Sequence, residues 1–187
     1  KQLSNNKNDR SMIEIVSSGI YTTLQDQGRF GSRHYGVPIS GPMDLISSQN
    51  ANRILGNDVN SPLLEFTLQG AILKFKHTAI IAITGACDSP TLNDKSISLN
   101  IPIIVRANDM LKIGKCTKGM YGYLSILGGF VSEKKLNSYS QYKDITKHRQ
   151  IRKGDGLQFN PAATLPNSLK AKIETIDFSC KEIEVFK

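Results

Sequence analysis

The sequence predicts a mainly β fold, either a sandwich or a barrel, with one principal α-helix. Nine short runs rich in β-branched residues recur along the chain, and Gly, Asn, Asp or Pro lies between them. Two of these runs, Leu64–Leu68 and Leu73–Lys76, alternate apolar and polar residues, which is typical of strands with one buried and one wet face. A single segment after Gly41-Pro42 carries apolar residues at helical spacing instead. The 187 residues are enough to bury one sizeable core.

Each strand is placed where an apolar run ends at turn residues. Residues 1–10 have almost no apolar content and are expected to form a tail, and residues 11–160 to form the folded domain. The predicted strands are Met12–Val16, Leu63–Thr67, Ala71–Phe75, Ala79–Thr84, Ile101–Val105, Met110–Ile113, Tyr121–Leu127, Leu157–Phe159 and Lys172–Ile176. Residues 161–187 are interpreted as a linker and the start of a second half, with Glu182–Phe186 as a partner strand.

The helix is predicted over Met43–Leu55, because Met43, Ile46, Ala51, Ile54 and Leu55 follow a near-helical spacing. Ser40 or Gly41 is expected as the N-cap, with Pro42 in the first turn. Gly56 is expected in the left-handed position that ends the helix. The polar stretch Ser132–Tyr142 is predicted to be an irregular loop.

Composition and charge exclude several classes of partner. Lys and Arg number 24 against 16 Asp and Glu, so the formal net charge is +8. The basic run over residues 147–153 lacks interleaved aromatic residues, which favours a solvated loop over a binding patch and argues against nucleic acid. No apolar stretch approaches the roughly 20 residues of a membrane helix, so no membrane partner is expected. Three distant cysteines suggest no metal site or disulfide framework, and predict reduced thiols in a cytoplasmic protein.

The stretch from Thr22 to Asp44 combines hydroxyls, an amide, two carboxylates and an arginine with five glycines. Glycine lets a backbone approach a ligand closely, so such a loop is a candidate binding site. The alternative is a tight-turn loop in which Asp26 and Arg29 pair with each other. His34 fits either a general base or a hydrogen-bonding bystander. Neither a GxGxxG nor a P-loop motif occurs, so ATP would need another subunit.

Two further segments carry candidate binding groups. Thr84-Gly85-Ala86 follows the most apolar strand, where backbone N–H groups can bind an anion, although a bulge or sharp exit from the barrel explains the glycine equally well. Asn52 is a poor helix former within the predicted helix, and polar contact with the glycine loop would explain it.

The sequence resembles a known family through four blocks in order: TTLQDQGRFGSRHYGVPISGPMD, NANRILGN, LLEFTLQGAILKF and ITGA. It is similar to the allophanate hydrolase subunit 2, or biotin-dependent carboxyltransferase-like, family, which includes the C subunit of 5-oxoprolinase and the KipA regulator. The resemblance implies a cyclophilin-like β-barrel, here the N-terminal half of a two-barrel family chain. It further implies a subunit of an ATP-dependent 5-oxoprolinase complex, which converts 5-oxo-L-proline to L-glutamate.

The resemblance also implies partners and alternatives. The partners would be an allophanate hydrolase subunit 1 (KipI-like) protein and a LamB/YcsF-type subunit. ATP would be bound through a partner subunit. A first alternative is a biotin-dependent carboxyltransferase domain of the urea carboxylase type, which takes a urea-like substrate rather than a lactam. It would require a biotin carrier, and the chain has no M-K-M-type biotin site. A second alternative is a non-catalytic KipA-like regulator that binds a KipI-like protein.

Most of the candidate site residues match the family's recurrent positions, which also include Asn57, Glu65 and Gly129, while His34 and Ala86 are candidates from their own segments alone. We expect Arg29 to hold a carboxylate or phosphorylated intermediate, Asp26 to orient it or act as base, and the backbone of residues 84–86 to bind an oxyanion. The predicted catalytic residues are Thr23, Gln25, Asp26 and Arg29. The predicted substrate-binding residues are Gly28, His34, Gly36, Ser40, Gly41, Asp44, Asn52, Thr84, Gly85 and Ala86.

Two positions depart from the family pattern. Tyr121 stands where the family usually has the arginine of a G-x-R-x-Y-L element, and Tyr139 where it has that of an L-G-S-R-S-T element. The loss of two anion-holding cations argues against an unchanged active site and favours the binding role.

Overall fold

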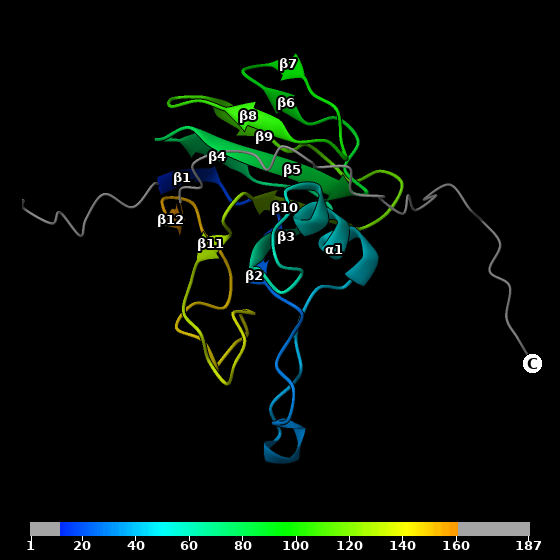
Figure 1. Cartoon of the computed structure of the whole chain (residues 1–187), viewed down its shortest axis with the longest axis vertical. Helices are drawn as coiled ribbons and strands as arrows, with labels where there is room; N and C mark the ends of the chain where they lie inside the picture. Colours follow the sequence, from blue (N-terminus) through cyan, green and yellow to red (C-terminus); the bar gives the residue numbers. More distant parts are fainter. Residues whose placement is uncertain (1–11, 161–187) are drawn as a thin grey trace, which may run out of the picture.

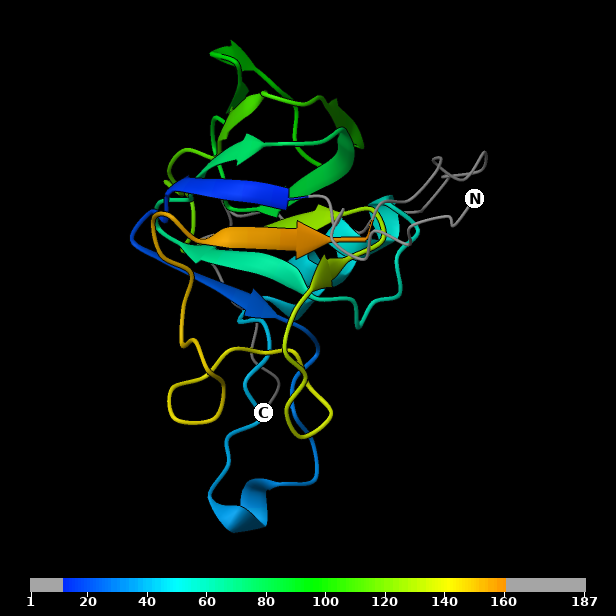
Figure 2. The same ribbon diagram turned by 90° about the vertical axis from the view of Figure 1, so that its left-hand side faces the viewer.

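The computed structural model describes residues 12–160 of the chain. The predictions for the tail at 1–10 and for the linker and strands at 161–187 lie outside the described residues. Within the described range the predicted fold class is confirmed: the molecule is mainly β, with two antiparallel sheets and one α-helix, as Figures 1 and 2 show. This arrangement fits the expected cyclophilin-like barrel.

The two sheets face each other across the core. The seven-stranded sheet contains, in spatial order, β11 (Phe130–Val131), β12 (Gly156–Phe159), β1 (Met12–Ser17), β4 (Ile72–Phe75), β9 (Met110–Lys112), β6 (Thr91–Leu92) and β7 (Lys95–Ser96). The five-stranded sheet contains β2 (Tyr21–Gln25), β3 (Leu63–Thr67), β10 (Tyr121–Ile126), β5 (Ala79–Gly85) and β8 (Ile103–Val105). Alternate residues of both sheets point inward, and fully buried side chains such as Ile13, Leu73, Phe66 and Leu124 form one core.

The helix α1 (Leu45–Ile54) covers the outer face of the five-stranded sheet and packs against β10 and β5 (Figure 1). Ala51 packs with Leu63 and Tyr123, while Ile54 and Leu55 pack with Ala82. The outer face of β3 is therefore covered rather than wet, which corrects the expectation from its alternating sequence.

The predicted start of the helix is wrong. Asp44, not Ser40 or Gly41, is the N-cap: its carboxylate accepts hydrogen bonds from the backbone N–H of Ser47 at 3.0 Å and from its hydroxyl at 2.6 Å. Ser40 and Gly41 have φ of 60° and 93°, which is incompatible with a first helical turn, so Pro42 precedes the helix. Gly56 has the expected left-handed φ, at 69°.

Strand β2 lies in a stretch that the sequence suggested was loop. Thr22, Thr23 and Gln25 obscure the alternation, yet all three side chains are buried. The other edge of β2 is covered by a loop rather than by another strand. The N–H of Leu24 donates to the side-chain Oε1 of Gln141, and the N–H groups of Gln141 and Ile151 donate to the carbonyls of Leu24 and Thr22. The short strands β6, β7 and β11 also lacked a periodic signal, whereas residues 132–142 form no helix, as predicted.

Candidate functional site

Two irregular segments project from the same end of the barrel. We call residues 26–44, which run from β2 to α1, the arm, and residues 132–152 the capping loop. Both views show them extending below the sheets, with the 3-10 turn η1 (Arg33–Tyr35) at the tip of the arm (Figures 1 and 2). Most residues singled out by the sequence lie in the arm or beneath it.

Asp26 ties the base of the arm to the capping loop. Its Oδ1 accepts hydrogen bonds from the hydroxyls of Ser138 at 2.6 Å and Ser140 at 2.7 Å, and from the N–H of Gly28 at 2.9 Å. Its Oδ2 accepts from the N–H of Tyr139 at 2.6 Å. The side chain is 6% exposed, so these donors replace water around the carboxylate.

Arg29 holds the same two segments together from the other side. It is fully buried, and its guanidinium donates to the carbonyls of Ser140 at 2.7 Å and Lys135 at 3.3 Å, and to the hydroxyl of Ser40 at 3.1 Å. Burial lowers the pKa of Arg29 from its ordinary value, and the negative charge of Asp26 opposes that shift. The sequence suggested that Asp26 and Arg29 either bind a ligand or pair with each other. Both side chains instead form hydrogen bonds with backbone and hydroxyl groups of the arm and the capping loop.

The other predicted polar groups at the base of the arm are also paired internally. Gln25 donates to the hydroxyl of Thr23 at 2.9 Å and accepts from the N–H of Gly41 at 3.1 Å. The N–H groups of Gly28 and Gly41 are thus engaged within the protein. Gly28 is required by close packing, since a Cβ there would lie 2.8 Å from the side chain of Ile39.

The backbone after β5 forms a bulged exit from the sheet, one of the two interpretations of Thr84-Gly85-Ala86. The N–H of Ala86 donates to the carbonyl of Tyr121 at 2.9 Å, so it is not free to bind an oxyanion. Gly85 has φ of 88°, and a Cβ there would lie 2.7 Å from the same carbonyl oxygen. The hydroxyl of Thr84 donates to the carbonyl of Ser47 in α1 at 2.7 Å.

A polar row lies beneath α1, and the sequence pointed to Thr23, Glu65 and Thr84 separately but not to Tyr123 or to their arrangement in one row. Strand register places Thr23, Glu65, Tyr123 and Thr84 side by side across β2, β3, β10 and β5. The Tyr123 hydroxyl donates to Glu65 at 2.8 Å and accepts from the N–H of Asp44 at 2.7 Å. Glu65 also accepts from the N–H of Met43 at 2.7 Å. The row therefore fixes the chain where the arm enters the helix.

Burial sets the protonation behaviour of this row. Glu65 is 6% exposed, and burial raises its pKa, although the hydrogen bonds from Met43 and Tyr123 oppose the shift. Burial likewise raises the pKa of Tyr123, and the neighbouring Glu65 adds to that shift. The alternation at 64–67 marked Glu65 as polar, but only the covering helix makes it a buried carboxylate.

Asn52 does not contact the arm, contrary to the prediction. Its amide donates to the carbonyl of Ser61 at 2.9 Å, and its carbonyl oxygen accepts from the hydroxyl of Ser125 at 2.6 Å. Asn57 extends this group by donating to Ile126 at 2.7 Å. These two asparagines join α1 to the loop after it and to β10.

The tip of the arm holds the accessible members of the predicted set, His34 and Gly36. The ring of His34 lies 3.9 Å from that of Tyr35, centroid to centroid. Tyr35 and Phe30 are 79% and 68% exposed, so the tip presents aromatic surface rather than a closed site.

The two tyrosines at the family arginine positions occupy different places. Tyr139 lies in the capping loop, with the ammonium of Lys134 5.5 Å from its ring centroid. Tyr121 lies in β10 on the outer face of the sheet, and Thr67 of β3 separates it from the half-exposed Tyr21 of β2.

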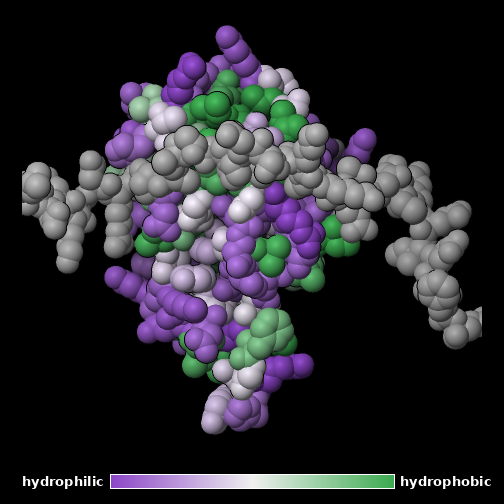
Figure 3. Space-filling view, in the orientation of Figure 1, coloured by the Kyte–Doolittle hydropathy of each residue, from purple (hydrophilic) through white to green (hydrophobic). Residues whose placement is uncertain are grey.

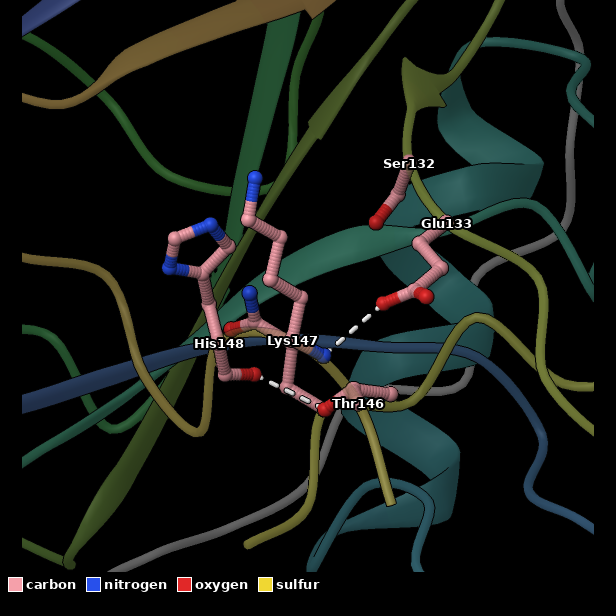
Figure 4. Close-up of a pocket in the computed structure, with 6 residues that line it drawn as sticks. Ser132, Glu133, Thr146, Lys147 and His148 are labelled. Carbon is pink, nitrogen blue, oxygen red and sulfur yellow. Dashed lines mark hydrogen bonds between the residues drawn. The ribbon is translucent and has the colours of Figure 1, made fainter. Parts of the chain in front are cut away.

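A hollow of about 320 Å³ opens between the two halves of the capping loop (Figure 4). Ser132 and Glu133 face Lys147 and His148 across it, and Gln141 also lines it. Glu133 accepts from the backbone N–H of Lys147 at 2.9 Å, and this bond lowers the pKa of the Glu133 carboxyl. Figure 3 shows hydrophilic side chains gathered over the same side of the molecule. The hollow combines hydroxyl, carboxylate, amide and cationic groups, none of which was in the predicted set.

Within residues 12–160, no three His, Cys, Asp or Glu side chains are arranged to hold a metal ion. In that part of the chain α1 is also too short and too polar to cross a membrane.

Comparison with known proteins identifies the family. The family model described as "Carboxyltransferase domain, subdomain A and B" matches residues 35–185. The chain belongs to this carboxyltransferase domain family. Urea amidolyase of Lachancea kluyveri is 46% identical over 131 residues, which are 70% of this chain and 7% of that protein. The C subunit of 5-oxoprolinase from Haemophilus influenzae is 40% identical over 129 residues, which are 69% of this chain and 42% of that protein.

A solved structure agrees with the family assignment. The crystal structure of Kluyveromyces lactis urea carboxylase superposes with a TM-score of 0.78 at 38% identity, and the match covers 88% of this chain and 15% of that one. The carboxyltransferase-family chain thus spans less than half the length of each of these three relatives.

Proposed function

We propose that this chain is a subunit of an ATP-dependent 5-oxoprolinase, working with a KipI-like protein and a LamB/YcsF-type subunit. The observation that carries the proposal is its 40% identity to the C subunit of a 5-oxoprolinase, of which it matches the largest share among the relatives given above. In the reaction the lactam C–N bond of 5-oxo-L-proline breaks. A water hydroxyl goes to the carbonyl carbon and a proton to the nitrogen, while ATP is hydrolysed to ADP and phosphate.

In this proposal Asp26 and Arg29 act as positioning residues. Each binds loop groups at the junction of the arm and the capping loop, and each is buried. Their contribution would be to hold the hollow between Glu133 and Lys147 in shape. The accessible hydroxyl, carboxylate and cationic groups of that hollow would then meet the substrate.

A biotin-dependent carboxyltransferase acting on urea is the second candidate. It is favoured by the 46% identity to a urea amidolyase and by the structural match to a urea carboxylase. Both substrates contain a nitrogen bonded to a carbonyl carbon, a group that one binding site can recognise in either. Under this candidate a separate biotin-carrier domain would bring the carboxyl group to the chain.

Reconstitution separates the candidates. The chain is purified with the KipI-like and LamB/YcsF-type proteins of its own source, and glutamate formed from 5-oxo-L-proline is measured with and without ATP. Glutamate that requires ATP and every subunit supports the proposal, and omission of this chain is the control. Carboxylation of urea with a biotin carboxylase and carrier, without glutamate formation, overturns it. Stable binding of the KipI-like protein without either turnover assigns the regulator role instead.

A further inference from the structure

The capping loop carries a second, basic hollow next to the first, and none of the roles above uses its arginines. It lies over residues 143–152 and has a volume of about 450 Å³, within the range of about 300–1,000 Å³ that is usual for ligand pockets. The cationic side chains that line it are Lys143, Lys147, Arg149 and Arg152, and His148 lies among them. Among the described residues of its lining, Asp144 is the one carboxylate.

The backbone beneath these cations is fixed at both ends. At one end the Thr146 hydroxyl accepts from the N–H of Tyr142 at 3.0 Å and lies 2.8 Å from the carbonyl oxygen of His148. At the other end Ile151 is 3% exposed, belongs to the main core and donates to Thr22 at 2.8 Å. The cationic side chains are therefore presented by an anchored loop, although they are themselves solvated.

The positive charge of the hollow is largely uncompensated. The ion pair between Lys143 and Asp144 is 3.9 Å long, and both side chains are more than two thirds exposed, so it contributes little. Within residues 12–160, the side chains of Lys147, Arg149 and Arg152 form no ion pair. Four cations and one carboxylate leave a formal charge of +3 around the hollow, with histidine neutral.

We propose that this hollow binds a phosphoryl-bearing anion, with a di- or triphosphate group as the preferred ligand. Several cations around one cavity match a ligand with several negative charges, and guanidinium groups match the geometry of phosphate oxygens. No Phe, Tyr or Trp side chain lines the hollow within the described residues, so stacking of nucleic-acid bases has no support there. The proposal revises the interpretation of residues 147–153 as merely solvated.

The basic hollow lies next to the first hollow. It shares Thr146, Lys147 and His148 with the first hollow, where Ser132 and Glu133 lie opposite. A phosphoryl chain held by Arg149 and Arg152 can therefore extend toward the groups considered for substrate binding. The inference does not rest on the proposed function, because binding can be measured on this chain alone.

Calorimetric titration of the full chain with inorganic tripolyphosphate tests the inference. Orthophosphate and citrate are titrated in parallel at constant ionic strength, because salt screens exposed charges. The double variant Lys147→Gln/Arg149→Gln removes two cations of the hollow. The matched control, Lys115→Gln/Lys118→Gln, removes two exposed cations from the turn before β10, outside the hollow. Thermal unfolding of each variant checks that the fold is intact.

We expect one saturable tripolyphosphate site that the hollow variant weakens at least about tenfold, as for the loss of charged hydrogen bonds, while the control variant leaves it unchanged. Citrate is expected to bind more weakly than tripolyphosphate. The inference is overturned if tripolyphosphate does not saturate, or if both variants weaken binding equally, which would indicate diffuse attraction only. It is also overturned if citrate binds as tightly, or if a short single-stranded RNA binds more tightly at the same salt concentration.

Discussion

Replacing Asp26 tests whether the residue that looked most catalytic in the sequence holds the loops together. Its carboxylate accepts four hydrogen bonds, of which three come from residues 138–140 of the capping loop. Asp26→Ala leaves two backbone N–H groups and two hydroxyls without this acceptor. The site is buried, since Asp26 itself is only 6% exposed. The base of the arm and the capping loop would then lose their main polar connection.

The magnitude follows from those bonds. A hydrogen bond to a charged group contributes about 1.5–3 kcal/mol, and contributions at one site are not additive. We therefore expect Asp26→Ala to lower the free energy of unfolding by about 3–5 kcal/mol, a large part of a typical domain's stability. Asp26→Asn keeps Oδ1, which accepts three of the bonds, but turns an amide toward the N–H of Tyr139. Its expected cost is smaller, at about 1–3 kcal/mol.

Urea unfolding followed by circular dichroism measures both variants against the wild type. Ser138→Ala is the matched control, because it removes a single donor and should cost about 1 kcal/mol. An Asp26→Ala protein as stable as the wild type would refute the reasoning. So would an Asp26→Asn protein that is fully stable but inactive in the reconstituted complex, because the carboxylate would then act on substrate rather than on the loop.

Three further predictions concern titration and backbone strain. The raised pKa of Glu65 means that its contribution to stability is complete below its unfolded pKa of about 4.3 and is lost as pH rises through the folded value. Glu65→Gln should therefore become more stable relative to wild type as pH rises above about 4.3, and parallel unfolding profiles would contradict this. Burial raises the pKa of Cys87 to about 12 and of Cys116 to about 11. Iodoacetamide at about pH 8 should therefore label both thiols at least about a hundredfold more slowly in the folded protein than in the urea-unfolded protein. Peptide mass spectrometry measures both labelling rates. Gly85→Ala should lower the free energy of unfolding by about 3 kcal/mol, but Gly31→Ala by about 1 kcal/mol. Both glycines have positive φ, and only a Cβ at position 85 would meet a backbone oxygen. Equal losses in urea unfolding would show that the contact with this oxygen is irrelevant.

The sequence predicts the central strands well because their apolar residues alternate or run continuously, and burial against one core imposes that pattern. Strand β2 shows the limit of this reasoning. Gln25 is hydrogen-bonded to Gly41 in the arm and to Gln141 in the capping loop, and neither contact leaves a periodic trace in residues 21–25. The helix start failed for a related reason. Met43 and Asp44 are held by Glu65 and Tyr123 from distant strands, so tertiary contacts decide where helical geometry begins.

The sequence predicted the irregular segment that carries the candidate site but not the contacts of its side chains. The residues from Thr23 to Asp44 do lie at one end of the barrel, because glycines and polar groups mark an irregular segment. Residue type could not reveal that Arg29 is fully buried against two carbonyl groups supplied from more than a hundred positions away in the sequence. The basic run at 147–153 posed the opposite problem, since a linear charge count cannot show whether side chains surround a common hollow.

These contacts divide the polar residues of the site into two groups with different chemistry. A buried carboxylate or guanidinium that is already hydrogen-bonded can bind a ligand only by giving up those bonds, which costs about as much as the new bonds would contribute. Solvated cations such as Lys147 and Arg149 lose only water. Ligand recognition in this chain should therefore fall to the capping loop, while Asp26 and Arg29 determine where that loop stands. A variant at either buried residue should consequently weaken tripolyphosphate binding without touching the anion, in proportion to how far the loop is released.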